Sequence, residues 1–275
     1  MTRKYKYDIL VIIMSQNVPL HNIGATDDLA FCTERSDFST TIIHREADTM
    51  MTSLAQQALM AFSLHHWAEG VMLATAADHS DPTLQAYLGY CYFHGKGVKQ
   101  DIEKAIKWFH RAAADGNPMA LFNLGYCLYN GIGLEQNTHE AAKCFLCAAQ
   151  GGDVFAQRII GALYENGEGV PQDMTQAAFW YGKAAEQGDA RAQCGYGICL
   201  KDGLGVEKNV EAAASWFKKS ALQGYPRAIF NLGLCYEEGL GVPLNGYAAI
   251  DHWVRAARAG LAEAQQLLAA RGIQW

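Results

Sequence analysis

Apolar side chains recur along most of the chain at the spacing of amphipathic helices. Leu84, Leu88 and Tyr92 follow one another at intervals of four residues and form one apolar stripe. A second stripe follows a glycine-rich loop and consists of Ala105, Trp108, Phe109, Ala112 and Ala113. This pattern predicts two helices joined by a short loop, and it returns several times along the sequence.

Glycines mark the boundaries of the repeating unit. Gly-x-Gly pairs recur every 36 residues without insertion, at Gly95/Gly97, Gly131/Gly133, Gly167/Gly169, Gly203/Gly205 and Gly239/Gly241. We expect each pair to end a helix, because glycine readily adopts the left-handed conformation of a helix C-terminus. A second series falls inside the first helix of each unit, at Gly89, Gly125, Gly161, Gly197 and Gly233. Glycine in a helix costs about 1 kcal/mol relative to alanine, so this series predicts close approach of a neighbouring helix.

Short polar residues stand where each helix should begin. The second helix of each unit is preceded by Asp101, Asn137, Asp173, Asn209 and Asn245, and three of the first helices by Asn117, Asp153 and Asp189. Their side chains can accept hydrogen bonds from the first N–H groups of a helix. Each unit is therefore expected to form an αα-hairpin. One hairpin cannot bury its own apolar face, so the units must stack into an all-α solenoid.

The repeated pattern resembles the Sel-1-like repeat family. It reads A-x-x-x-L-G-x-x-Y-x-x-G-x-G-V-x-x-D followed by A-x-x-W-[FY]-x-x-A-A-x-x-G. Residues 153–188 match it at Ala156, Ile160, Gly161, Tyr164, Gly167, Gly169, Val170, Asp173, Ala177, Trp180, Tyr181, Ala184, Ala185 and Gly188. The resemblance implies a tetratricopeptide-like superhelical solenoid with five repeats over residues 81–260. It also implies a non-catalytic protein-binding scaffold or adaptor. Bacterial relatives act in signalling, envelope or host interactions, or as immunity proteins.

The two ends depart from the repeat. Residues 49–80 are expected to form a degenerate N-capping hairpin, because Ala76 and Ala77 keep the register of the second helix but no Gly-x-Gly pair precedes them. Residues 261–275 are expected to form a C-terminal capping helix, since Ala264 and Leu268 keep the register of the first helix. Residues 1–48 match nothing in the pattern and are treated as an extension of unknown structure.

Composition and charge restrict the kinds of partner. Half of the residues are hydrophobic and the net charge is −6, so the chain can bury a core and has no basic surface for nucleic acid or anionic membrane. The apolar run from Ile9 to Met14 is too short for a signal peptide or a membrane helix. We therefore expect a cytoplasmic protein whose partner is another protein or a peptide, with no cofactor.

Tetratricopeptide-like packing would place the first helix of each unit on a concave face. The positions of these helices outside the repeat pattern are aromatic in the early repeats and mixed in charge later, with Glu165, Lys201, Glu237 and Glu238 among the later ones. Aromatic and arginine side chains are typical of binding hot spots. The predicted partner-binding residues are Tyr90, Phe93, His94, Phe122, Tyr126, Tyr129, Phe155, Arg158, Arg191, Arg227 and Phe230. The alternative is that the aromatic residues pack between adjacent helices.

Two alternative functions rest on short motifs. Ser215-x-x-Lys218 matches the S-x-x-K of penicillin-interacting serine enzymes, and some members of the resembled family have been described as β-lactamase-like. No S-D-N or K-T-G motif accompanies it, so a β-lactam or peptidoglycan-directed hydrolase is the less favoured interpretation. Cys144-x-x-Cys147 suggests a thiol-based metal or haem site. The motif is expected inside a helix and has no second ligand pair, and such surroundings do not favour metal or haem binding. The eight cysteines are interpreted mainly as buried free thiols.

Overall fold

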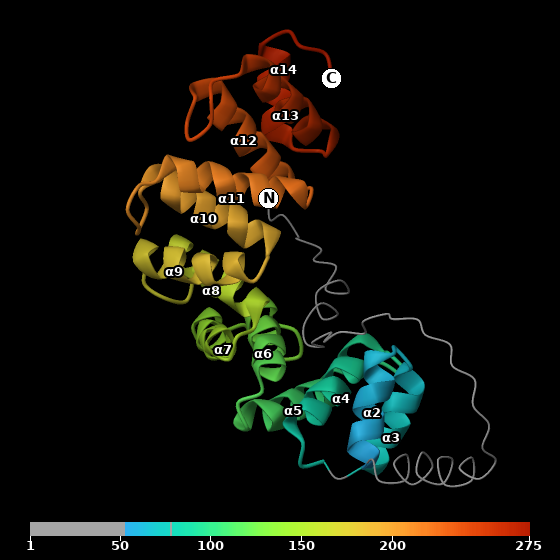
Figure 1. Ribbon diagram of the computed structural model, residues 1–275. Helices are drawn as coiled ribbons and strands as arrows, with labels where there is room; N and C mark the ends of the chain where they lie inside the picture. Colours follow the sequence, from blue (N-terminus) through green and yellow to red (C-terminus); the bar gives the residue numbers. More distant parts are fainter. Residues whose placement is uncertain (1–52, 78) are drawn as a thin grey trace, which may run out of the picture. The chain divides into compact units, whose positions relative to one another are not determined.

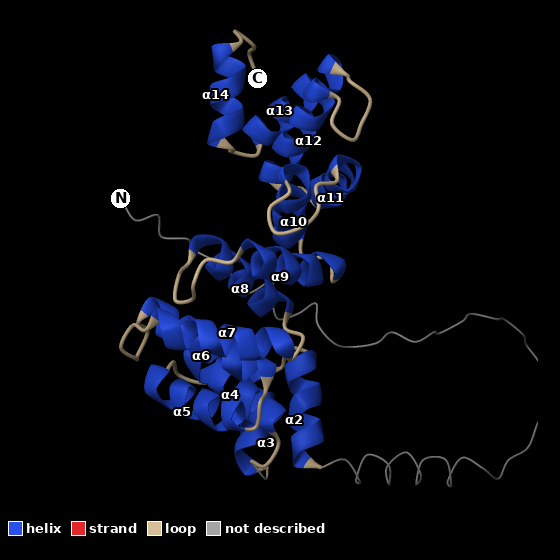
Figure 2. Ribbon diagram, turned by 90° about the vertical axis from the view of Figure 1, so that its left-hand side faces the viewer, coloured by secondary structure: helices blue, strands red, loops and turns tan. Residues whose placement is uncertain are grey.

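The computed structural model describes residues 53–77 and 79–275, so the expectations for residues 1–48 lie outside the described residues. The described part is built from helices and loops, and it contains no strand (Figures 1 and 2). An N-terminal pair is followed by five longer pairs and a last helix. In chain order they are α2 (Leu54–Ser63), α3 (Trp67–Ala76), α4 (Pro82–His94), α5 (Ile102–Ala114), α6 (Pro118–Asn130), α7 (Thr138–Gln150), α8 (Val154–Asn166), α9 (Met174–Glu186), α10 (Ala190–Asp202), α11 (Val210–Leu222), α12 (Pro226–Glu238), α13 (Gly246–Arg258) and α14 (Ala262–Ala270).

The helices alternate between two structural roles. We call α4, α6, α8, α10, α12 and α14 the A helices, and α5, α7, α9, α11 and α13 the B helices. Each A helix from α4 to α12 packs against the B helix that follows it, and each B helix packs against the next A helix. The all-α solenoid of αα-hairpins predicted from the sequence is confirmed.

The predicted helix starts are confirmed for every B helix. For example, the Asp101 carboxylate accepts the backbone N–H of Lys104 at 3.0 Å, and Asn245 accepts that of Ala248 at 3.0 Å. The A helices are less uniform. The first four are capped by Asp81, Asn117, Asp153 and Asp189. Tyr225 and Leu261 stand in this position before α12 and α14, and neither provides a side-chain cap.

The glycine inside each A helix makes room for a ring of the paired B helix. A Cβ atom at Gly89 would lie 2.6 Å from the Phe109 ring, and one at Gly233 would lie 2.6 Å from the Trp253 indole nitrogen. The B-helix backbone is also near, since the Ala105 carbonyl oxygen would lie 3.3 Å from a Cβ at Gly89. Glycine thus allows the A helices of the five repeats to seat a buried ring, and these rings form the centre of the core.

The second glycine of each Gly-x-Gly loop joins successive units. A Cβ atom at Gly205 would collide with the backbone of Met174, and one at Gly241 with the backbone of Val210. Both contacts lie in the first turn of the preceding B helix. Gly97 meets Trp67 and Ala68 in the first turn of α3 in the same way. The helix α3 therefore takes the place of a B helix ahead of the first repeat.

Buried glutamines add a second link between successive units. The Gln157 side chain donates to the Ala149 carbonyl of α7, and it accepts a hydrogen bond of 2.8 Å from Gln187 at the end of α9. Gln193 repeats the arrangement one unit later with Ala185 and Gln223. These bonds satisfy amides that are almost fully buried, as buried polar groups require.

Helices flank the five repeats at both ends, and the predicted capping roles of these terminal elements stay predictions. α2 and α3 form a hairpin in which Phe62 is 1% exposed. α14 packs on α13 through Ala264 and Leu268, which are both fully buried. The stacking order of the units therefore continues on both sides of the five repeats.

Replacing Gly205 by alanine tests the link between units. Gly205→Ala brings a Cβ atom against the Met174 backbone at a φ of 70°, so we expect a loss of about 2–4 kcal/mol in the free energy of unfolding. Gly224→Ala is the matched control, because its φ of 82° is also positive but no atom lies within 4 Å of the added Cβ. Urea unfolding followed by circular dichroism measures both, and equal losses would contradict this role for the loop.

Candidate functional site

Three of the predicted partner-binding aromatics are buried in the described structure. Tyr90 is 2% exposed, Phe122 7% and Phe93 8%. Tyr90 lies against Trp67 of α3, with the ring centroids 5.7 Å apart, and Phe122 lies against Phe145 at 5.8 Å. These rings therefore offer little surface for a partner, and the helix-packing alternative describes them. The sequence could not separate these cases, because the same aromatic residue suits both.

The other aromatic positions keep part of their surface. Tyr126, Phe155 and His94 are half-buried, and Tyr126 and Phe155 lie beside the buried Phe93 and Phe122. The Tyr129 hydroxyl donates to Glu168, in the loop between α8 and α9 of the next unit, at 2.7 Å. Burial, with help from the Lys96 charge, lowers the pKa of His94, so its imidazole favours the neutral form. Their role in partner binding stays a prediction.

The three predicted arginines differ in their surroundings. Arg158 is held inside the structure, because its Nε lies 3.3 Å from Asp189 and the two side chains are only 12% and 10% exposed. Arg191 is exposed in the first turn of α10. Arg227 is 58% exposed, and its Nη2 lies 3.6 Å from Glu263 of α14. Arg158 therefore forms a structural ion pair with Asp189, whereas Arg191 and Arg227 belong to the accessible surface.

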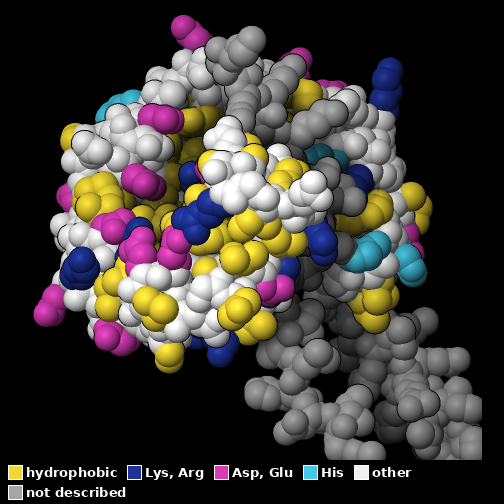
Figure 3. Space-filling view, turned by 90° about the horizontal axis from the view of Figure 1, so that it is seen from above, with side chains coloured by type: hydrophobic (Ala, Val, Ile, Leu, Met, Phe, Trp, Pro, Cys, Tyr) yellow, Lys and Arg dark blue, Asp and Glu magenta, His cyan; other side chains and the backbone are white. Residues whose placement is uncertain are grey.

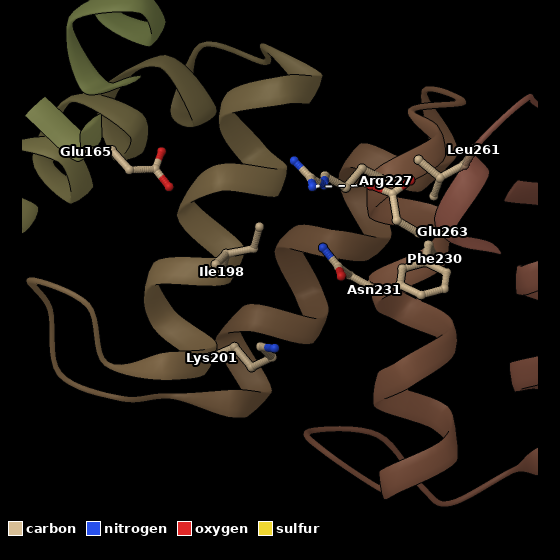
Figure 4. A pocket seen from close by; sticks show the side chains of 8 residues that line it. All are labelled: Glu165, Ile198, Lys201, Arg227, Phe230, Asn231, Leu261 and Glu263. Atoms are coloured by element: carbon tan, nitrogen blue, oxygen red, sulfur yellow. Dashed lines mark ion pairs between the residues drawn. The ribbon is translucent and has the colours of Figure 1, made fainter. Parts of the chain in front are cut away.

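A cavity of about 320 Å³ lies on the A-helix side of the last repeats (Figure 4). It opens between α10 and α12 and reaches α8 and α14. Its lining combines apolar groups with charges of both signs: Glu165, Ile198, Lys201, Arg227, Phe230, Asn231, Leu261 and Glu263. Figure 3 shows the same mixture of apolar, basic and acidic side chains on the face seen there. Of the predicted site residues, Arg227 and Phe230 lie at this cavity.

The carboxylate of Glu165 at the cavity is already engaged. The Tyr181 hydroxyl donates to its Oε2 at 2.6 Å. Burial and this hydrogen bond raise the pKa of Tyr181, so the phenol stays protonated and keeps donating. Lys201 is 28% exposed, and its nearest carboxylate oxygen, from Asp202, is 3.4 Å away.

Sequence reasoning missed four residues of the cavity, namely Ile198, Asn231, Leu261 and Glu263. One signal was present in the chain. The capping series before the A helices changes from Asp and Asn to Tyr225 and then Leu261, and Leu261 lines the cavity. The remaining three carry no such mark, because isoleucine, asparagine and glutamate are ordinary residues on a helix surface.

The motifs behind the alternative functions gain no catalytic or metal-binding surroundings in the described residues. Ser215 and Lys218 are exposed on α11, and Ser215 does not line the 110 Å³ cavity to which Lys218 contributes. Cys144 is half-buried and Cys147 exposed on α7. Burial raises the pKa of the Cys144 thiol to about 11, which disfavours the thiolate needed for metal binding or redox chemistry. Within residues 53–77 and 79–275, no three His, Cys, Asp or Glu side chains gather as metal ligands would.

The remaining cysteines of the described region are buried. Cys91, Cys127, Cys194, Cys199 and Cys235 contribute to the core, and burial raises the pKa of Cys91 and of Cys127 to about 12. Protonated thiols in such surroundings behave as small apolar groups. In the described part of the chain, no helix has the length and apolar character to cross a membrane.

The fold defines a class of protein, an αα-hairpin repeat solenoid with a mixed apolar and charged cavity on its A helices. The family model of the Sel1 repeat matches residues 82–117, 118–153, 154–189, 190–225 and 226–261, more than half of the chain. The chain therefore belongs to the Sel1 repeat family, as its resemblance to Sel-1-like repeats implied. Proteins of this family are generally protein-interaction scaffolds.

Two solved structures show close similarity. A Sel1 repeat protein from Oxalobacter formigenes is 29% identical, with a TM-score of 0.72 over 79% of this chain and 87% of its own. A protective antigen of uropathogenic Escherichia coli with an SLR fold is also 29% identical, with a TM-score of 0.69 over 82% of this chain. This chain spans 50% of the length of that antigen. No curated protein matches the chain.

Two arginine substitutions separate structural from surface roles. Arg158→Ala leaves the buried Asp189 carboxylate without its charge partner, so we expect a loss of about 3–5 kcal/mol in the free energy of unfolding. Arg227→Ala removes only a half-exposed pair, which is expected to change that free energy by less than about 1 kcal/mol. Thermal and urea unfolding measure both, and a similar loss for the two variants would show that Arg227 is structural too.

Proposed function

We propose that this protein is a non-catalytic scaffold or adaptor that holds a partner protein or peptide on the side formed by its A helices. The observation that carries this proposal is the cavity between α10 and α12, with its apolar walls and charged rim. Binding surfaces combine buried apolar anchors with polar groups that select the partner. The scaffold role that is general in the Sel1 repeat family supports the same conclusion.

The charges on the B helices support the choice of the A-helix side. Lys107 pairs with Glu103 at 2.6 Å and Lys143 with Glu140 at 2.8 Å, each within one helix and both exposed. Such pairs are typical of a solvated helix face and contribute little energy. On the A helices, by contrast, Arg227 and Glu263 come from different helices and stand beside half-buried apolar side chains.

The more specific parts of the proposal concern the compartment of the protein and the kind of partner that it binds. We propose a cytoplasmic bacterial protein whose partner is a protein or peptide rather than nucleic acid or a membrane surface. The net charge of −6 supports the exclusion of nucleic acid. A regulatory role and an immunity-type role, in which the scaffold occupies a toxic partner, are both compatible with such a surface.

Affinity capture with matched variants tests the proposal. Tagged full-length protein is used to capture partners from lysate of its native host, with quantification by mass spectrometry. The A-helix variant combines Tyr129→Ala, Arg191→Glu and Arg227→Glu. We expect it to lose the specific partner by at least about tenfold, because these half-buried or exposed side chains lie on the proposed surface.

A B-helix variant controls for charge and for loss of an aromatic ring. It combines Phe179→Ala, Lys107→Glu and Lys183→Glu, all at exposed positions, and changes the net charge by the same amount. We expect this variant to retain the partner as well as the wild-type protein does. Equal retention by both variants, or loss only in the B-helix variant, would show that the A-helix side is not the binding surface.

A further inference from the structure

The hairpin of α2 and α3 lies at one end of the described solenoid and is poor in charge (Figure 1). The two helices have ten residues each, and Glu69 is their one charged residue. Large apolar side chains stand in solvent instead, since Met60 is 66% exposed, Leu64 55% and Met72 65%. The end units of repeat solenoids need a polar outer face, because no further unit stacks on them. The described residues of this hairpin do not supply such a face.

The end of α2 has the same backbone geometry as the end of the A helix α4. Gly95 follows α4 with a left-handed φ of 68°, and His65 follows α2 with a left-handed φ of 64°. In both places the N–H of the next residue donates to the carbonyl four positions before the left-handed residue, at 2.9 Å. α2 therefore corresponds to an A helix, and in this register Met60 is the counterpart of Tyr90.

Tyr90 shows what this position does in the repeat. Its ring lies 5.7 Å from that of Trp67 in α3, so it faces the hairpin that precedes its own, and it is 2% exposed. Tyr87, one turn earlier, stacks on Phe62 of the same preceding hairpin at 5.1 Å. No unit precedes α2 in the part of the chain that the structure describes, and Met60 is exposed. The surface around Met60 is thus the kind that joins successive units, left uncovered.

The chain itself contains an apolar segment ahead of α2. Residues 9–14 read Ile-Leu-Val-Ile-Ile-Met, six apolar side chains in succession. Such a run has apolar groups on every side, so it needs cover in water whatever conformation its backbone takes. Two uncovered apolar surfaces of one chain remove each other from water when they meet.

The connection permits this contact and favours it over contact with a second molecule. Residues 15–53 join the apolar run to α2, and a stretch of that length can span on the order of 100 Å. The helix α2 is only about 15 Å long. A tethered segment reaches an effective concentration of roughly millimolar order, far above that of a protein at micromolar concentration. Residues 9–14 therefore have the advantage over a second copy for this surface.

We propose that residues 9–14 pack on α2, against Met60 and Leu64, and take the place of a preceding unit. The N-terminal extension then caps the solenoid, and the hairpin of α2 and α3 lies beneath this cap. This inference goes beyond the proposed scaffold function and does not depend on it.

Photocrosslinking within the full chain tests this contact. Benzoylphenylalanine replaces Met60, the purified protein is irradiated at low micromolar concentration, and the tryptic peptides are identified by mass spectrometry. We expect a crosslink to the tryptic peptide of residues 7–35, with the attachment site within residues 9–14. The same photocrosslinker at Phe179, which is 49% exposed on α9, is the control and should not crosslink to this peptide.

An isotope mixture identifies which molecule supplies the segment. Equal amounts of unlabelled and heavy-isotope-labelled protein are combined and equilibrated before irradiation. A contact within one chain gives crosslinked peptide pairs in which both peptides are labelled or both are unlabelled. Mixed pairs would mean that a second copy supplies the segment, and the inference of a cap within the chain would be wrong.

Charged substitutions in the run test whether apolar packing holds it in place. Ile9→Asp with Ile12→Asp is expected to lower the crosslink yield from position 60 by at least about tenfold, because two carboxylates oppose burial. The same variant should increase the fluorescence of a dye that binds exposed apolar surface. Ser36→Asp with Ser39→Asp adds the same charge outside the run and should keep the wild-type yield. Circular dichroism confirms that both variants are folded.

The results that overturn this inference are distinct from failure of the scaffold function. No crosslink from position 60 to residues 9–14, or a yield that Ile9→Asp with Ile12→Asp leaves unchanged, would show that the run does not cover α2. An equal yield from position 179 would show that the run has no preferred surface. Partner capture that depends on the A helices would still support the scaffold function in each case.

Discussion

The second glycine of each Gly-x-Gly loop packs against the first turn of the helix that precedes its own hairpin, and the stacking of the units depends on this contact. At Gly205 and Gly241 a Cβ atom would overlap the neighbouring backbone. The loop therefore cannot carry a side chain at these two positions, where main-chain contact sets the approach of one unit to the next. At Gly133 the side chains of Ile102 and Ile106 take the place of the backbone. The period of 36 residues, kept without insertion, follows from the same constraint, because a longer loop would move this contact.

Because of this arrangement, the A helices contribute only part of the contacts that join successive units. Fully buried rings of the B helices, such as Phe109 and Trp253, fill the space inside each hairpin, and loops and glutamines join the hairpins. The A-helix positions outside the repeat pattern can therefore vary. In the early repeats they are used for aromatic packing, as at Phe122. In the last repeats they form the cavity with Arg227. Within one repeat, the residues that hold the units together are thus different from the residues that form the binding surface.

The fold could be predicted almost completely from the sequence, whereas the site could be predicted only in part. The 36-residue period and the Asn245-type caps each have a local cause, so they can be recognised without the structure. Whether Tyr90 faces a partner or packs on Trp67 depends on a helix outside the repeat pattern, and local sequence does not contain that information. The cavity likewise needs Glu165 and Glu263 from units far apart in sequence. From the sequence, Arg227 and Phe230 were predicted as site residues, but nothing showed that they share a cavity with Leu261.

The most direct test of the central claim, that partners bind on the A helices, is site-specific photocrosslinking in living cells of the native host. Benzoylphenylalanine is placed at Ile198, at the cavity of α10, or at Phe179, which is 49% exposed on α9. The account predicts a partner crosslink from position 198 and none from position 179. A crosslink from position 179 alone would contradict it and would assign the binding surface to the B helices.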